Sequence, residues 1–179
     1  MHRIGIRSIA LAVLLSGAST VTAQAQKDLA SCKPVLDATA KQFKTPTHGF
    51  SSTGGSAGTS SDGEIIFVGG MSYVKTRNVW RRSPTTVEEM AKEHQENIKS
   101  ATAVSCKHVG DELTAGTPAA VYETTQENDG TKAHSRIWIA KSTGLPLRID
   151  TDIDTGVAAS THRSIRYEYT NVQAPSGVK

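Results

Sequence analysis

The sequence contains only two cysteines among its 179 residues, and its charges nearly balance. Two cysteines are too few for a disulfide-dense mini-protein. A hydrophobic fraction of 37% with a formal net charge of +3 excludes a disordered polar chain. After the amino terminus, no apolar run reaches the roughly 20 residues that a membrane-spanning helix needs. We therefore expect one globular domain.

The first 25 residues have the pattern of a secretory signal peptide. Arg3 and Arg7 precede an apolar run at 9–15, and Ala23-Gln24-Ala25 forms a small-x-small cleavage site. We expect cleavage after Ala25 and export to the periplasm or the exterior. Loss of the two leader arginines reduces the 20 basic residues to 18, against 17 acidic residues. The remaining charge of +1 favours no nucleic-acid partner.

The domain that we expect, residues 26–179, holds both cysteines, Cys32 and Cys106. Because an exported chain meets oxidising conditions, we predict one disulfide between them. The alternative is that Leu29-Ala-Ser-Cys32 acts as a lipobox whose cysteine is acylated. A lipobox directly follows the apolar run, however, whereas the charged pair Lys27-Asp28 intervenes here. Acylation would also leave Cys106 unpaired.

Two segments have the periodicity of amphipathic helices. In the first, over residues 29–43, Pro34 fits only in the first turn. The second, over residues 87–101, follows a capping box if Thr85 is the N-cap. The apolar stripes consist of Leu29, Cys32, Leu36, Ala40 and Phe43 in the first segment and of Val87, Met90, Ala91, His94, Ile98 and Ala101 in the second.

The other segments predict strands joined by hairpin turns such as Asn128-Asp129-Gly130. The low-complexity stretch Ser51–Gly63 is predicted to be a flexible loop. Successive hairpins imply an antiparallel sheet. We thus expect an α+β domain with a curved sheet of about seven strands and two helices on its concave side. The predicted strands cover residues 64–68, 71–82, 103–109, 119–126, 133–141, 145–152 and 161–172.

No catalytic, cofactor or metal motif emerges. The sequence has no G-x-S-x-G elbow and no phosphate-binding glycine loop followed by lysine. The histidines after the leader form no H-x-x-x-H pair. The stretch Asp150–Gly156 has aspartate at alternate positions, but its glycine and position twelve do not fit an EF-hand. We predict a polar strand face there, and a protein that is not an enzyme.

Aromatic and arginine side chains on the predicted strands are the candidate ligand contacts. The arginines either face an anionic group or belong to a solvated, paired surface. The aromatics either pack in the sheet or line an apolar cavity, the usual form of a ligand site. The predicted ligand-binding residues are Trp80, Trp138, Tyr73, Tyr167, Arg81 and Arg148.

Three stretches resemble the LolA-like superfamily. The segment 136–148, with Trp138 before a Thr143-Gly-Leu-Pro146 turn, is similar to a strand–turn–strand signature of that family. Ala140 stands where the family often has aspartate. Residues 167–172 and the hairpin at 72–81 resemble two further family strands. The resemblance implies a half-open antiparallel barrel, helices over an apolar cavity, and binding of acyl chains in the periplasm.

Two functions stay open at this stage. The first is a carrier or sensor of lipid or lipoprotein acyl chains that binds its hydrophobic ligand in the concavity of the sheet. The second is a protein-interaction module, such as an envelope-stress sensor or an inhibitor of an exported enzyme. For the second, Ser51–Gly63 is the expected contact with the protein partner.

Overall fold

The computed structural model describes residues 27–55, 60–156 and 160–178. The predicted signal peptide, residues 1–25 with its cleavage site, lies outside the described residues. The centre of the predicted loop, residues 56–59, lies outside them as well. No helix within the described ranges is long and apolar enough to cross a membrane.

Two helices and nine strands make up the described residues. The helices are α1 (Lys33–Gln42) and α2 (Val87–Ser100), close to their predicted positions. Pro34 lies in the first turn of α1, where its missing N–H costs no hydrogen bond. The strands are β1 (Thr47–Gly55), β2 (Ser60–Val68), β3 (Met71–Thr76), β4 (Val79–Arg82), β5 (Ala103–Thr114), β6 (Thr117–Asn128), β7 (Thr131–Ala140), β8 (Pro146–Asp154) and β9 (Thr161–Glu168).

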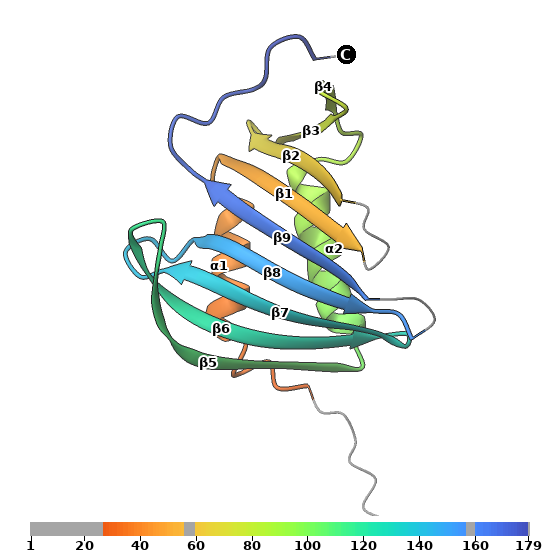
Figure 1. The fold of residues 1–179 in the computed structure, drawn as a ribbon, viewed down its shortest axis with the longest axis vertical. Helices are drawn as coiled ribbons and strands as arrows, with labels where there is room; N and C mark the ends of the chain where they lie inside the picture. Colours follow the sequence, from red (N-terminus) through yellow and green to blue (C-terminus); the bar gives the residue numbers. More distant parts are fainter. Residues whose placement is uncertain (1–26, 56–59, 157–159, 179) are drawn as a thin grey trace, which may run out of the picture.

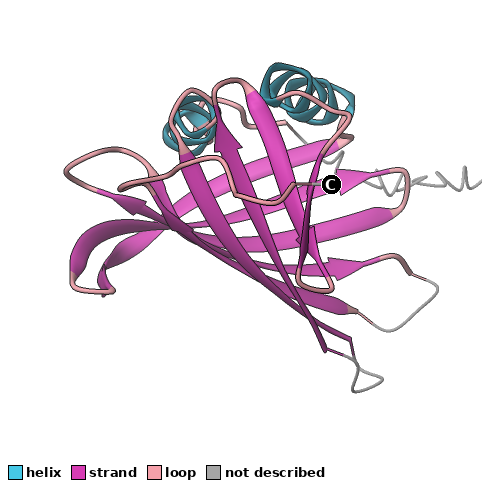
Figure 2. Cartoon of the chain, turned by 90° about the horizontal axis from the view of Figure 1, so that it is seen from above, coloured by secondary structure: helices cyan, strands magenta, loops and turns pink. Residues whose placement is uncertain are grey.

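All nine strands form one antiparallel sheet in the order β4-β3-β2-β1-β9-β8-β7-β6-β5. β4 and β5 are its two edges, so the sheet does not close into a barrel. Both helices lie against the same face of the twisted sheet (Figure 1, Figure 2). We call this the helix-covered face, which carries Ile137 and Ile149. The opposite face, which carries Trp138 and Arg148, is called the outer face.

The stretch Ser51–Gly63 corrects the sequence-based prediction of a loop. Residues 51–55 belong to β1 and residues 60–63 to β2, and β1 pairs with both β2 and β9. Small polar side chains leave no hydrophobic pattern, but the backbone N–H and C=O groups of β1 are satisfied by strands on both sides. The predicted contact segment is therefore mostly the paired part of a hairpin.

The segment 71–82 was expected to be one strand and is instead the β3–β4 hairpin. Arg77 and Asn78 form its turn with φ angles of 50° and 64°. Two consecutive residues with positive φ are typical of a type I′ turn, whose twist suits a two-residue hairpin. This hairpin and the added β1 raise the strand number from the expected seven to nine.

The cap of α2 lies one residue later than expected. Thr86, rather than Thr85, accepts a hydrogen bond from the backbone N–H of Glu89 at 3.2 Å. The Glu89 carboxylate in turn accepts one from the backbone N–H of Thr86 at 2.7 Å. This reciprocal arrangement is a capping box. The Thr85 carbonyl instead accepts a hydrogen bond from the Ser72 hydroxyl.

One cluster of the core lies between α1 and the sheet. Val35 and Ala38 of α1 pack against Ile137 and Ile139, which alternate along β7 toward the helix-covered face. The predicted apolar stripe of the first helical segment is only partly correct. Leu29 precedes α1 and is 42% exposed, and Ala40 is also exposed, because the buried face of α1 is rotated toward Val35 and Ala38.

The predicted disulfide between Cys32 and Cys106 is present. Cys32 immediately precedes α1, and Cys106 lies on β5, so the bond fixes the amino-terminal end of α1 to an edge strand. Cys32 is fully buried beside Ala101 and Val104. A disulfide of this kind is typical of proteins in oxidising, extracytoplasmic compartments.

Candidate functional site

A cavity of about 330 Å³ lies between the two helices and the sheet. Strand alternation explains its lining, because every second residue of β2, β7, β8 and β9 points to the helix-covered face. The apolar stripes of α1 and α2 cover the opposite side. Its apolar lining includes Val35, Leu36, Phe67, Ile137, Ile149 and Ile165.

A second space, a groove of about 580 Å³, runs between α1 and α2. Val87 and Ala91 of the predicted α2 stripe line this groove but not the cavity. The groove and the cavity are adjacent, since some side chains line both. The shared residues are Leu36, Phe43, His94 and Ile98.

His94 is one of the side chains that separate the cavity from the groove. Its ring centroid lies 6.0 Å from that of Phe43. Burial lowers the pKa of His94, because desolvation disfavours the charged imidazolium. The side chain is therefore neutral near pH 7 and adds no charge to the boundary between the cavity and the groove. His94 was predicted on the apolar stripe of the second helical segment, and it does face the cavity and the groove.

Polar side chains also line the cavity. Gln42, the last residue of α1, is only 4% exposed, and its Nε2 has no hydrogen-bond partner in the described part of the chain. Burial raises the pKa of Tyr167, while the Gln42 amide and the Arg163 guanidinium act in the opposite direction. All three residues line the cavity. Sequence reasoning missed Gln42, because a glutamine at the end of a helix carries no signal of burial.

One of the six predicted ligand-binding residues, Tyr167, lines the cavity. Trp138 and Arg148 lie on the outer face. The Trp138 Nε1 donates a hydrogen bond to Glu112 at 2.7 Å, and the Arg148 guanidinium lies 5.1 Å from the Trp138 ring centroid. Arg148 also pairs with Asp150. These contacts match the sequence alternative of a paired strand surface.

The other three predicted residues lie near the β4 edge. Trp80 is half-buried, with the Lys75 ammonium 5.7 Å from its ring centroid. Tyr73 is two residues from Lys75 in β3 and so shares its face of the strand. Arg81 is exposed on β4. The structure does not bring these three together with Tyr167, and their role in ligand binding stays a prediction.

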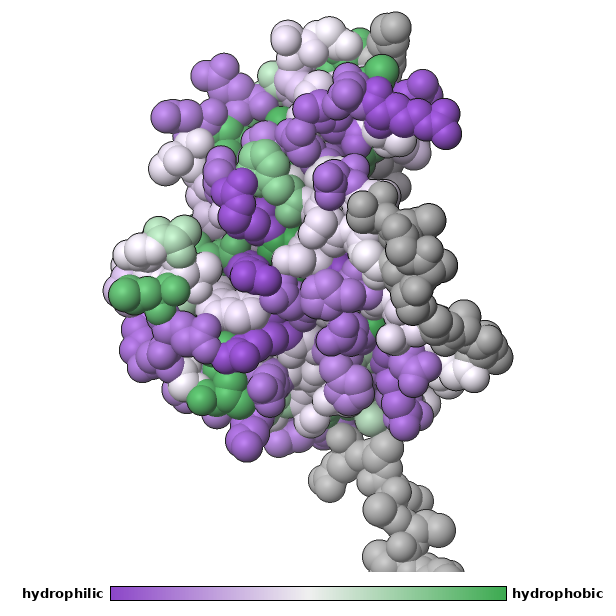
Figure 3. Space-filling view, viewed as in Figure 1, coloured by the Kyte–Doolittle hydropathy of each residue, from purple (hydrophilic) through white to green (hydrophobic). Residues whose placement is uncertain are grey.

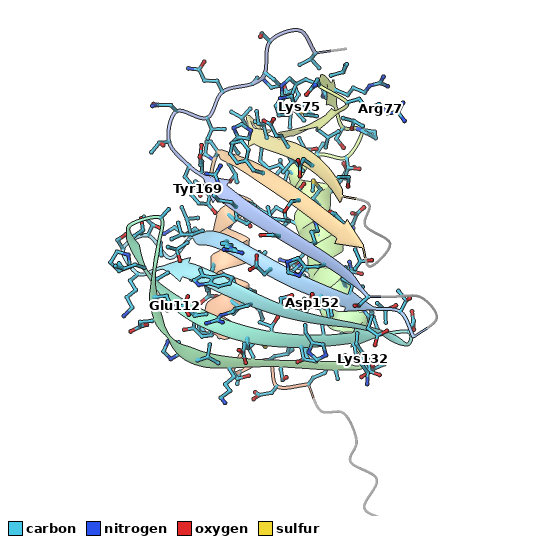
Figure 4. The ribbon with its side chains drawn as sticks, in the orientation of Figure 1. Lys75, Arg77, Glu112, Lys132, Asp152 and Tyr169 are labelled. Atoms are coloured by element: carbon cyan, nitrogen blue, oxygen red, sulfur yellow. A yellow bond between two sulfur atoms is a disulfide. The ribbon has the colours of Figure 1, made fainter. Side chains whose placement is uncertain are left out.

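The outer face is mainly a polar surface (Figure 3). Charged side chains cover it, among them Glu112 and Asp152 (Figure 4). Asp152 accepts a hydrogen bond from His162 at 2.8 Å, and Asp150 accepts one from Ser164 at 2.6 Å. The alternating aspartates of β8 thus form the predicted polar strand face. Within the described residues, no group of three His, Cys, Asp or Glu side chains could hold a metal ion.

Comparison of the sequence alone finds no matching protein-family model, and no curated protein matches it. The structure, however, is similar to the lipoprotein LppX of Mycobacterium tuberculosis, with a TM-score of 0.51 and 13% identity over 83% of this chain and 100% of LppX. MucB of the Pseudomonas aeruginosa MucA/MucB complex has a TM-score of 0.43 and 12% identity over 83% of this chain and 62% of MucB. A LolA superfamily protein of Nitrosomonas europaea has a TM-score of 0.31 and 8% identity, covering 77% of this chain and 91% of that protein. The similarity to LppX shows that this chain has the same fold, in agreement with the LolA-like resemblance of its sequence motifs.

Proposed function

We propose that this protein is a non-enzymatic binding protein of the periplasm or the exterior, which carries or senses a lipid or acyl chain. The observation that carries the proposal is the cavity of about 330 Å³ between the helices and the sheet. Apolar side chains from both helices and from the sheet make up most of its lining. Concave, mostly apolar cavities with a small number of polar groups are the usual form of a small-molecule site.

The energetics favour an aliphatic ligand. Each CH₂ group that moves from water into such a cavity gains about 0.8 kcal/mol. The cavity volume lies near the lower end of the range for ligand sites, about 300 to 1,000 Å³. We therefore expect one chain in the cavity, with further chain length in the adjoining groove between α1 and α2.

The fold and the disulfide support this assignment. The similar LppX is a lipoprotein, and the LolA-like motifs of the sequence imply binding of acyl chains. The Cys32–Cys106 disulfide fits export to an oxidising compartment. We propose that Tyr167, the predicted ligand residue that lines the cavity, contacts the chain.

Native mass spectrometry of the exported protein, purified without delipidation, tests the proposal. We expect an adduct of lipid mass that organic solvent removes. After its removal, the apolar fluorophore N-phenyl-1-naphthylamine should bind and gain fluorescence. A bare polypeptide that also fails to bind the fluorophore would overturn the carrier proposal and favour the protein-interaction alternative.

A pair of tryptophan substitutions locates the binding site. Leu36→Trp adds bulk where the cavity meets the groove and should abolish fluorophore binding. Leu113→Trp makes the same change at a side chain that is 74% exposed on β5 and should leave binding unchanged. Equal binding by both variants would place the fluorophore elsewhere and would contradict the proposal.

A further inference from the structure

The buried amide of Gln42 is chemically unusual for its position. Its side chain reaches an apolar cavity, is 4% exposed, and has an Nε2 without a hydrogen-bond partner among the described residues. Most buried polar groups in proteins are hydrogen-bonded, because an unpaired donor loses its interaction with water. A donor left unpaired in a ligand cavity is suited to a ligand that brings an acceptor oxygen.

Two residues of β9, Tyr167 and Arg163, line the same cavity as Gln42. The Gln42 amide and the Arg163 charge both lower the pKa of the Tyr167 hydroxyl, against the larger effect of its burial. Tyr167 stays protonated because burial raises its pKa, so its O–H is available as a donor. The cavity thus has donors from α1 and β9 in a lining that is otherwise mostly apolar, with further polar side chains such as Thr124, Gln126 and Ser135.

Arg163 supplies a positive charge to the lining of the cavity. It lines the cavity but is itself exposed, which places its guanidinium at an opening of the cavity. Within the described part of the chain, no carboxylate forms a salt bridge with it. Arg166, three residues further along β9, instead pairs with Glu168 and lies 4.5 Å from the Phe50 ring centroid on the outer face.

We propose that the cavity recognises the carboxylate of a single acyl chain through Gln42, Tyr167 and Arg163. The Gln42 Nε2 and the Tyr167 hydroxyl donate hydrogen bonds to the carboxylate oxygens, and Arg163 balances the charge. Hydrogen bonds to charged groups are stronger than those to neutral ones, which favours a free acid over its ester. This inference rests on the proposed function, because it names the class of ligand in the same cavity.

Binding of cis-parinaric acid and of its methyl ester, measured by fluorescence on the disulfide-bonded protein, tests the inference. The wild type should bind the acid more tightly than the ester. Gln42→Leu should weaken binding of both by about tenfold, since both present an acceptor oxygen. Arg163→Gln should weaken binding of the acid alone, and Arg166→Gln, the matched control on the outer face, should change neither.

Further outcomes separate the inference from the proposed function. N-phenyl-1-naphthylamine has no carboxyl group, so its affinity should be the same for the wild type, Gln42→Leu and Arg163→Gln. If Gln42→Leu does not fold, Gln42→Glu retains the size of the side chain and should reject the acid by charge repulsion. Tighter binding of the ester by the wild type, or unchanged affinities in the Gln42 and Arg163 variants, would overturn carboxylate recognition. Absence of binding of every probe would instead overturn the proposed function.

Discussion

Replacement of Gly49 by alanine should destabilise the fold through one crowded contact. Gly49 is buried in the centre of the sheet, on β1 between β2 and β9. A Cβ atom there would lie 2.9 Å from Ile65 Cγ2 and 3.3 Å from two ring carbons of Tyr167. Because the Ile65 methyl group is attached directly to a β-branched carbon, it has little freedom to move away.

The expected magnitude follows from two opposing effects. Overpacking of a well-filled site costs about 1 to 3 kcal/mol. The loss of backbone freedom in the unfolded chain offsets about 0.4 to 1 kcal/mol of that cost. Gly54→Ala on the same strand is the matched control, because its Cβ would meet no atom within 4 Å. The backbone effect is common to both variants, so the difference between them isolates the packing cost of about 1 to 3 kcal/mol.

Urea unfolding followed by circular dichroism measures this difference. With an m-value of about 2 kcal/mol per molar urea, the midpoint of Gly49→Ala should lie about 0.5 to 1.5 M below that of Gly54→Ala. Displacement of the Tyr167 ring should also reduce binding of N-phenyl-1-naphthylamine in the Gly49 variant alone. Equal midpoints for the two variants would refute the packing argument, because they would show that the sheet makes room for the added methyl group.

Three further changes affect stability at separate points. Replacing both Cys32 and Cys106 by alanine removes a disulfide that joins residues 74 positions apart. In urea titrations the unfolding free energy should fall by about 2 to 5 kcal/mol. An unchanged midpoint would contradict this prediction. Burial lowers the pKa of His94 from its ordinary 6.5. As the pH falls through 6.5, the histidine is therefore protonated more readily in the unfolded chain than in the folded chain. The unfolding free energy should therefore fall as the pH decreases from 7 toward 5, and His94→Gln should flatten this slope. Thr86→Ala should lower the unfolding free energy by about 1 kcal/mol through loss of the α2 cap, whereas Thr85→Ala should lower it less. The reverse order in thermal unfolding would indicate that Thr85 is the N-cap, as the sequence predicted.

Local chemistry made several elements predictable. The two helices follow from their apolar periodicity and from Pro34 in the first turn of α1. The β6–β7 hairpin follows from Asp129-Gly130, whose φ angles of 45° and 78° suit those residue types. The cap was misplaced by one residue because adjacent threonines offer equivalent oxygens. β1 was missed because serine, threonine and glycine leave no hydrophobic alternation, and because one of its two pairing partners, β9, lies far away in the sequence.

The candidate site was less predictable than the fold. Tyr167 was among the predicted ligand residues and lines the cavity, and Arg163 was one of the strand arginines considered as contacts to an anionic group. Gln42 was not predicted, because a glutamine signals no cavity in a linear pattern. Trp138 and Arg148 were predicted as ligand contacts because one is an aromatic and the other a cationic side chain on predicted strands. Alternation along β7 instead directs Trp138 to the outer face, where Glu112 binds its indole N–H.

The sequence by itself determined the helices, most of the hairpins and the α+β class, because each depends on residues close together in the chain. The tertiary structure decided which face of each strand the helices cover. It also placed Gln42 at the end of α1 in the lining of the same cavity as Tyr167 and Arg163 on β9, more than 100 residues later. Burial of an unpaired amide arises only when separate elements exclude water together, so no local pattern encodes it.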